Sequence, residues 1–387
     1  MKTTKEFVIK QNNSIPFDLA SFFKNGALVQ MSQNQFKLIL GPFRIVKSFN
    51  AVIANHETAL LQPDFWDFLP RYSPNSSIKS LSSSEKVILL GEAVYEFTRD
   101  QLVEELLTLT ASRPPIHWAP VNEDLFVEQF LWSQESMALS ELRKTVPIIE
   151  QEGRTTWSHE SLNWCLQNLL KVEQQGWTYG FWQNGKGYLG HSPELIADWS
   201  AKNQTFSTAA LAGTFKPDID ESVAWKDQKT KDEHEIVIED IFEQLKTVLS
   251  AKQIKQSHTY LQRLAHLSHF KTDFTVAGIL FEQAIKLIDV LHPTAALGIF
   301  PRRYEFFQKF SQLKLQTRRK TFAAPLTFIS PESVFSIGMI RNLFFSEDCV
   351  QIFSGCGVTA ASELKSELQE LDRKRTAVKK ILGLAND

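Results

Sequence analysis

Three glutamates near the C-terminal end, Glu363, Glu367 and Glu370, have a spacing that could bring their carboxylates together. At positions i, i+4 and i+7 of a helix these side chains share one face. Mg²⁺ is typically held by one or two carboxylates with ligand oxygens and water, and Glu233 could add a carboxylate from a second helix. The upstream loop Gly355-Cys356-Gly357 follows a predicted strand, and its exposed amides could bind a substrate carboxylate. Spacing alone favours a solvated acidic stripe, so the magnesium site is a hypothesis that rests also on the upstream loop and on Leu364, Leu368 and Leu371, which predict a buried neighbouring face.

Four other patterns resemble functional motifs but lack the context that those motifs need. Residues 185–190 match GxGxxG but continue a hairpin signal and run into Ser192-Pro193, so we expect no dinucleotide site. His234-Glu235 begins like HExxH, but Ile238 stands where the second zinc ligand would be. Arg318-Arg319-Lys320 is expected to form a solvated turn. Three cysteines are too few and too badly spaced for a disulfide framework or a zinc site.

The elements that would position these residues are long helices mixed with antiparallel strands. Asn184-Gly185 separates two strand-like runs, which predicts a hairpin over residues 177–190. A second hairpin is expected from residues 36–40 and 43–46, with Gly41-Pro42 at its turn. Helical spacing occurs at residues 125–144, 159–170, 232–249, 281–290 and 361–382, and strands are expected at 334–339 and 350–353. This mixture favours an α+β fold over a regular βαβ array.

Charge and motif content indicate what kind of protein this is. Residues 1–124 carry little motif content and form an N-terminal part, whereas residues 125–387 form the candidate catalytic region. A net charge of −2 offers no basic excess for nucleic acid. No apolar stretch approaches the roughly 20 residues of a membrane span, and no signal peptide is visible. We therefore expect a cytoplasmic protein whose partners are neither nucleic acid nor membranes.

Eight short stretches, taken in order over residues 125–382, resemble the chorismate-utilising family. That family includes isochorismate synthases, salicylate synthases and the large subunits of anthranilate and aminodeoxychorismate synthases. The resemblance implies one large α+β body, with two antiparallel sheets packed face to face and helices outside. The matching stretches are Ser192-Pro193-Glu194-Leu195, Leu211-Ala212-Gly213-Thr214, Lys229 with Glu233-His234, Ala265-His266-Leu267, Leu291-His292-Pro293-Thr294, Ile340-Arg341, Gly355-Cys356-Gly357, and Glu367 and Glu370 followed by Lys374.

The resemblance also implies a reaction and the residues that carry it. Mg²⁺ binds the ring carboxylate of chorismate, a nucleophile attacks C2, and the C4 hydroxyl departs with help from a general acid. By motif position Glu194 would be that acid, a role for which burial could raise its pKa. Glu233 and Glu370 would be the principal metal ligands with Glu367 nearby, and His266 would line the site near the leaving group. Substrate contacts would come from Ala212, Gly213, Thr214, Thr294, Arg341, Gly355 and Gly357; an arginine fork suits a carboxylate.

The residue at position 144 separates the branches of the family by nucleophile. Water-using members carry Lys where ammonia-using members carry Gln, and Lys144, 50 residues before Glu194, matches that position. A lysine can deprotonate water only if desolvation or nearby cations lower its pKa. Ala212 stands where aminodeoxychorismate-forming members typically carry Lys. The resemblance thus implies a magnesium-dependent isochorismate synthase, an isomerase feeding menaquinone or siderophore synthesis, with no amidotransferase subunit.

Three alternatives stay open. A salicylate synthase would add pyruvate elimination on the same residues, and an amine-forming enzyme would need Gln at position 144. A non-catalytic chorismate-binding protein is the third, because the chain departs from the family pattern at Thr230, Ile299, Ala324 and Leu364. Thr230 replaces an acid near the expected metal, while Ile299 and Ala324 replace glycines, and their side chains could narrow the site.

Overall fold

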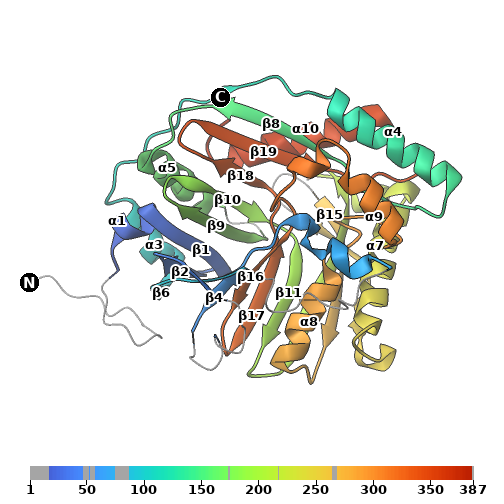
Figure 1. Cartoon of the computed structure of the whole chain (residues 1–387), viewed down its shortest axis with the longest axis horizontal. Coiled ribbons are helices and arrows are strands. Elements are labelled where there is room, and N and C mark those ends of the chain that lie inside the picture. Colours follow the sequence, from blue (N-terminus) through green and yellow to red (C-terminus); the bar gives the residue numbers. More distant parts are fainter. Residues whose placement is uncertain are drawn as a thin grey trace, which may run out of the picture.

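The computed structural model describes residues 17–46, 52, 57–74, 87–172, 175–216, 218–263 and 268–385. Within these residues, two large antiparallel sheets pack face to face and helices cover their outer sides (Figure 1). The α+β, two-sheet architecture predicted above is therefore confirmed.

Both sheets are continuous antiparallel arrays. In spatial order the nine-stranded sheet contains β6 (Ala93–Thr98), β2 (Gln35–Leu40), β1 (Asn25–Ser32), β9 (Trp177–Gln183), β10 (Lys186–Ser192), β18 (Asn342–Phe345), β19 (Cys349–Gly355), β8 (Ile148–Arg154) and β7 (His117–Trp118). The ten-stranded sheet contains β13 (Lys255–Gln256), β15 (Ser268–Val276), β12 (Thr205–Phe215), β11 (Leu195–Ser200), β17 (Ser333–Gly338), β16 (Pro325–Ile329), β4 (Ala59–Leu61), β5 (Ile88–Leu90) and β3 (Arg44–Val46), and β14 (Tyr260–Arg263) also pairs with β15.

The N-terminal part contributes strands to both sheets. β1 pairs with β9, placing Ala27 opposite Phe181, and β4 pairs with β16, placing Leu60 opposite Phe328. Strands from before and after residue 125 thus belong to the same two sheets.

The core follows from the alternation of side chains along the strands. In β1, Val29 points between the sheets, where it joins a buried cluster with Leu60 and Phe328 of the opposite sheet. Its neighbour Leu28 points to the other face, into a second cluster with Leu166 of an outer helix. Full burial of such an aliphatic side chain contributes about 1.5–3 kcal/mol, so both faces of the nine-stranded sheet stabilise the fold.

Helices close the outer faces of the sheets (Figure 1). Asp227 begins α7 by accepting a hydrogen bond from the Thr230 amide. The helices are α1 (Leu19–Lys24), α3 (Arg99–Leu106), α4 (Asp124–Leu139), α5 (His159–Leu170), α6 (Glu221–Ala224), α7 (Gln228–Lys246), α8 (Phe281–Leu291), α9 (Tyr304–Ser311) and α10 (Leu364–Ile381), with 3₁₀ turns at Phe65–Tyr72, Ala251–Gln253 and Gln316–Arg318. No described helix combines the length and apolar character needed to cross a bilayer.

One prediction of local structure is wrong, and one predicted helix is wrong only at its C-terminal end. Residues 36–46 do not form a hairpin, because β2 pairs with β1 and β6 while β3 pairs with β5 in the other sheet. Gly41-Pro42 is where the chain crosses between sheets, and a Gly-Pro pair marks either event equally. The helix expected at 125–144 ends at Leu139, and Lys144 lies in an extended segment.

The hairpin at Asn184-Gly185 is confirmed. Both residues have positive φ angles, 50° and 75°, as a tight two-residue turn requires. The GxGxxG pattern therefore lies in this turn and in β10 and does not open a helix, as expected.

Candidate functional site

A cavity with an empty volume of about 720 Å³, counted to its open mouth, lies where elements of both sheets meet α7 and α10. Strand β12 supplies one wall through Leu211, Ala212, Gly213 and Thr214, and the end of β19 supplies another through Ser354 and Gly355. The other lining residues are Lys144, Val146, Pro193, Glu194, Glu233, His269, Ala296, Leu297, Arg319, Phe322, Ala323, Ile340, Arg341, Phe353, Cys356, Gly357, Glu370 and Lys374.

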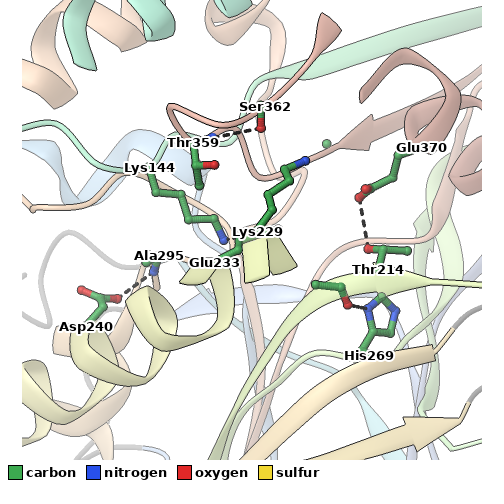
Figure 2. Close-up of polar contacts among 12 residues, drawn as sticks. Lys144, Thr214, Lys229, Glu233, Asp240, His269, Ala295, Thr359, Ser362 and Glu370 are labelled. Atoms are coloured by element: carbon green, nitrogen blue, oxygen red, sulfur yellow. Dashed lines mark hydrogen bonds and ion pairs between the residues drawn. The ribbon is translucent and has the colours of Figure 1, made fainter. Parts of the chain in front are cut away.

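Each of the three predicted metal carboxylates is paired with a lysine. Lys144 Nζ lies 3.0 Å from Glu233 Oε1, and Figure 2 shows its side chain extending toward that glutamate. Lys229 and Lys374 lie 2.6 Å from Glu367 and Glu370, respectively. These six residues come from three separate elements, so the carboxylates and ammonium groups neutralise one another across the site.

The pKa values of the two carboxyl groups of α10 are shifted in opposite directions. Burial raises the pKa of Glu367, and Glu370 raises it further, although Lys229 opposes both effects. Burial alone would also raise the pKa of Glu370, but Lys374 and the hydroxyl of Thr214, 3.1 Å away, outweigh it and hold that pKa below its usual value. Glu370 is thus the carboxylate of α10 that is kept ionised.

Glu194 is the buried carboxyl group of the cavity. Its side chain is 3% exposed, and Oε1 has no hydrogen-bond partner among the described residues. Burial raises its pKa to about 8, and the ammonium groups of Lys144 and Lys374 lower it only in part. Glu194 therefore carries a proton at neutral pH and lines the same cavity as Lys144, which is 1% exposed.

Arg341 and His269 complete the polar lining. Arg341 has a positive φ of 56°, and burial lowers its pKa to about 10, so it stays cationic. His269 Nδ1 lies 2.9 Å from the carbonyl oxygen of Gly213, which fixes the tautomer with the proton on Nδ1. Burial lowers the pKa of His269 to about 3, so the ring is neutral and Nε2 can only accept a hydrogen bond.

Gly357 is the point where the backbone comes closest to the paired groups. A Cβ at this position would lie 2.0 Å from Glu233 Oε1 and 2.7 Å from Lys144 Cε. Only glycine leaves room there for the carboxylate and the lysine stem, which explains the second glycine of the Gly-Cys-Gly loop.

Replacing Gly357 with Ala should therefore displace both Glu233 and Lys144 and lower kcat by about 100-fold, the effect of misplacing a reacting group by about 1 Å. Steady-state rates, with a thermal melt to show an intact fold, test this. The matched variant Gly355→Ala meets Val146 Cγ1 at 3.1 Å, a contact that a small shift relieves, so its loss should be much smaller. Equal effects of the two substitutions would contradict this explanation.

The carboxylates of the cavity could hold a Mg²⁺ ion. Among the described residues, no group of three or more His, Cys, Asp or Glu side chains converges as a ready ligand cluster. Glu233, Glu367 and Glu370 are instead each paired with a lysine. Mg²⁺ needs only one or two carboxylates, with water and substrate oxygens completing the shell, and Glu233 and Glu370 both line the cavity. Glu233 and Glu370 therefore have the chemistry to hold the ion.

Most residues expected from the sequence line this cavity. Lys144, Glu194, Ala212, Gly213, Thr214, Glu233, Arg341, Gly355, Gly357 and Glu370 do so. Thr294 and Glu367 are not among the lining residues, although Ala296 and Leu297, just after Thr294, are. His266 lies outside the described residues, so its expected role has no structural account.

Sequence reasoning assigned no role to three basic or histidine side chains that line the cavity, those of Arg319, Lys374 and His269. Arg319 was expected in a solvated turn, but it is 1% exposed, donates hydrogen bonds to the carbonyls of Phe322 and Leu297, and stacks on Phe65. The Arg-Arg-Lys run does not reveal this, because nothing in the sequence indicates that Arg319 turns inward. Lys374 was noted only as part of a motif. His269 could have been found from the alternation along β15, which places it opposite Thr214.

The family departures do not narrow the cavity. Ile299 and Ala324 are fully buried in the hydrophobic core and do not line the cavity wall. Thr230 is also buried, and its Cγ2 lies where a side chain at Gly213 would be, 2.2 Å from an added Cβ. The concern that these replacements obstruct the site is therefore not supported.

Comparisons with known proteins agree with this arrangement. The isochorismate synthase MenF of Bacillus subtilis (strain 168) is 27% identical over 231 residues, which cover 56% of this chain and 47% of that protein. MenF of Escherichia coli (strain K12) is 25% identical over 320 residues, covering 77% of this chain and 71% of that protein. This chain thus matches about half the length of the first relative and most of the second.

The fold is shared with solved structures of the same group. The structure of MenF from Escherichia coli superposes with a TM-score of 0.72 at 17% identity, covering 95% of this chain and 91% of that one. Anthranilate synthase component I from Streptococcus pneumoniae TIGR4 gives a TM-score of 0.66 at 11% identity, covering 96% and 94%. A family model described as chorismate binding enzyme matches residues 116–383, well over half of the chain. The chain therefore belongs to the chorismate-binding enzyme family.

Proposed function

We propose that this protein is a magnesium-dependent isochorismate synthase, which converts chorismate to isochorismate. The observation that carries the proposal is the placement of a protonated, buried Glu194 and a buried Lys144 in one cavity. An acid and a base held in the same pocket fit a reaction that adds water at one carbon and removes a hydroxyl at another. The names of the relatives from Bacillus subtilis and Escherichia coli support the same reaction.

The charge of the cavity suits a substrate with two carboxylates, such as chorismate. Of the described lining residues, Lys144, Arg319, Arg341 and Lys374 have basic side chains, and three carry carboxyl groups. With Glu194 protonated, only Glu233 and Glu370 remain as carboxylates. Arg341 could bind one substrate carboxylate bidentately, and the amides of residues 355–357 could hold the other.

Glu233 and Glu370 would hold Mg²⁺, which would neutralise the ring carboxylate of the substrate and accept electron density from it. The other steps belong to the protein's own side chains. Lys144 must first lose its own proton; as the free amine it takes a proton from a water molecule while the water oxygen bonds to C2, and the two ring double bonds shift. Glu194 delivers its proton to the C4 hydroxyl, which leaves as water. One water enters and one departs, so the product is an isomer of chorismate.

The acid role of Glu194 predicts how the rate depends on pH. A general acid must carry its proton, so loss of the Glu194 proton should make kcat/KM fall by about tenfold per pH unit above the pKa of about 8. A rate profile from pH 6 to 10 at saturating Mg²⁺ measures this. An alkaline limb that begins near pH 5, the range of an ordinary carboxyl group, would contradict the role.

The test of the proposed function is incubation of the purified protein with chorismate and Mg²⁺, with separation of the products by chromatography. Isochorismate approaching a reversible equilibrium with chorismate is the expected result, and EDTA should abolish it until Mg²⁺ is restored. Salicylate with pyruvate would indicate a salicylate synthase instead. An aminated product that depends on ammonia would indicate the amine-forming branch, and bound but unchanged chorismate would indicate a binding protein.

A further inference from the structure

We propose that Asp240 is a positioning residue that holds Lys144 against Glu233 from the far side of the cavity wall. Asp240 lies seven residues after Glu233 on α7, so the two side chains share a helix face. It does not line the cavity, and it is fully buried. The inference rests on the proposed role of Lys144 as the base.

Asp240 is bound on all sides by donors from one loop. Its Oδ1 accepts a hydrogen bond from Arg302 Nε at 2.7 Å, and its Oδ2 accepts from Arg302 Nη2 and from the Ala295 amide, both at 2.7 Å. Figure 2 shows the carboxylate facing the Ala295 amide, below Lys144 and Glu233. Such a bidentate arginine–carboxylate pair fixes the orientation of Arg302 relative to Asp240 as well as the distance between them.

Arg302 also binds the backbone at the end of α8. Its Nη1 donates to the carbonyl of Val290 at 2.6 Å, and its Nη2 donates to the carbonyl of Leu291 at 3.2 Å. Burial would lower the pKa of Arg302, but the Asp240 carboxylate outweighs it and raises that pKa, so the charge is permanent. Asp240 and Arg302 therefore hold α7, the end of α8 and the residue-295 loop together.

The same loop holds the backbone of Lys144. The Lys144 amide donates to the Phe300 carbonyl at 3.0 Å, and the Phe300 amide donates back to the Lys144 carbonyl at 2.9 Å. Phe300 is two residues before Arg302. These contacts form a closed set, called the circuit below. Asp240 binds Arg302, Phe300 two residues earlier binds the backbone of Lys144, and Lys144 Nζ lies 3.0 Å from Glu233, on the same helix as Asp240.

The circuit fixes where the base stands relative to Glu233. Lys144 lies in an isolated bridge outside the sheets and beyond the end of α4, so no regular ladder fixes it. Its side chain has four rotatable bonds, and a small shift of its backbone would move Nζ out of line with the attacking water. A misplacement of about 1 Å in such a group can cost about 100-fold in rate.

The test is the variant Asp240→Asn, with Glu239→Gln as its matched control. Asn keeps the shape but places an NH₂ group against the donors of Arg302 or Ala295. Glu239 is the adjacent residue of α7, and its ion pair with Arg143 at 2.7 Å is about half exposed on both sides, 48% and 47%, so its loss should matter little. We expect Asp240→Asn to lower kcat by about ten- to hundredfold with KM nearly unchanged, measured well below the melting temperature.

A second readout does not depend on the substrate. Lys144 is 1% exposed and should resist acetylation by a lysine-reactive reagent, as followed by peptide mass spectrometry. In Asp240→Asn its modification should become several-fold faster relative to exposed lysines, and in Glu239→Gln it should not. A purely structural role would lower the melting temperature and leave both kcat and this protection intact.

The outcomes separate the two proposals. If the wild type converts chorismate and Asp240→Asn keeps a normal kcat, the positioning role is overturned while the proposed function stands. If the wild type does not act on chorismate, the proposed function fails. The protection of Lys144 from acetylation then decides by itself whether Asp240 positions Lys144. Continued protection of Lys144 in Asp240→Asn would then overturn it.

Discussion

Replacing Glu194 with Gln should lower kcat by about 10²–10⁴-fold, the usual contribution of a positioned general acid. Gln keeps the shape and volume of the side chain but has no acidic proton to give to the departing hydroxyl. Substrate binding should change little, because Arg341 and the residue 355–357 loop remain in place. Steady-state kinetics with chorismate, together with a thermal melt, would measure the effect.

The fold should tolerate this substitution. Glu194 Oε1 has no hydrogen-bond partner among the described residues, so the change breaks no bond at that atom. Glu150 offers a matched control, because burial raises its pKa as well, to about 7, but it lies on β8 beside Arg318 and Gln351 and does not line the cavity. Glu150→Gln should be nearly as active as the wild type. Comparable activity in Glu194→Gln would remove Glu194 from the mechanism.

Replacing Lys144 with Met should cause a loss of similar size, about 10²–10⁴-fold in kcat. Met keeps most of the buried aliphatic stem of Lys144, which is 1% exposed, but cannot accept a proton from water. The expected result is an enzyme that binds chorismate and does not turn it over. Calorimetric binding of chorismate, measured beside the rate, distinguishes this from a collapsed site.

Binding of Mg²⁺ shows whether Lys144 acts as a base or as a structural partner. Removing the ammonium group 3.0 Å from Glu233 leaves that carboxylate free, so Mg²⁺ should bind at least as tightly as in the wild type. Lys379→Met is a suitable control, because its ammonium group contacts Gln151 and the ring of Trp118 rather than the cavity. Weaker Mg²⁺ binding in Lys144→Met would mean that the lysine mainly holds the site together.

The sequence predicts the fold well where periodicity and turn chemistry agree. The helix at 159–170 and the hairpin at Asn184-Gly185 form as expected, and α7 and α10 differ from prediction only at their ends. Family motifs in order identify the residues that gather in the cavity from strands and helices distant in sequence. Local patterns alone could not have brought Glu194 and Glu370 together, because their proximity depends on how the two sheets pack.

Three features lie beyond what spacing can predict. Gly41-Pro42 has the same local chemistry in a turn as in a crossover between sheets. The predicted pairing of β2 with β3 was therefore wrong. Arg319 points inward from a run of three cations, and only the tertiary structure shows which of them is buried. The pairing of Glu233 with Lys144 and of Glu367 with Lys229 is also invisible from spacing, because the partners are far apart in the chain, whereas Glu370 and Lys374 have the i,i+4 spacing of a helical pair.

The central claim, that this protein adds water to chorismate with loss of the C4 hydroxyl, is tested most directly by an isotope experiment. Chorismate is incubated with the protein and Mg²⁺ in ¹⁸O-labelled water, and the products of early conversion are examined by mass spectrometry. We expect isochorismate that carries one solvent-derived oxygen atom, located at C2. A sample in which EDTA has removed the metal should form no labelled isochorismate. Unlabelled isochorismate, or no conversion of chorismate at all, would contradict the claim.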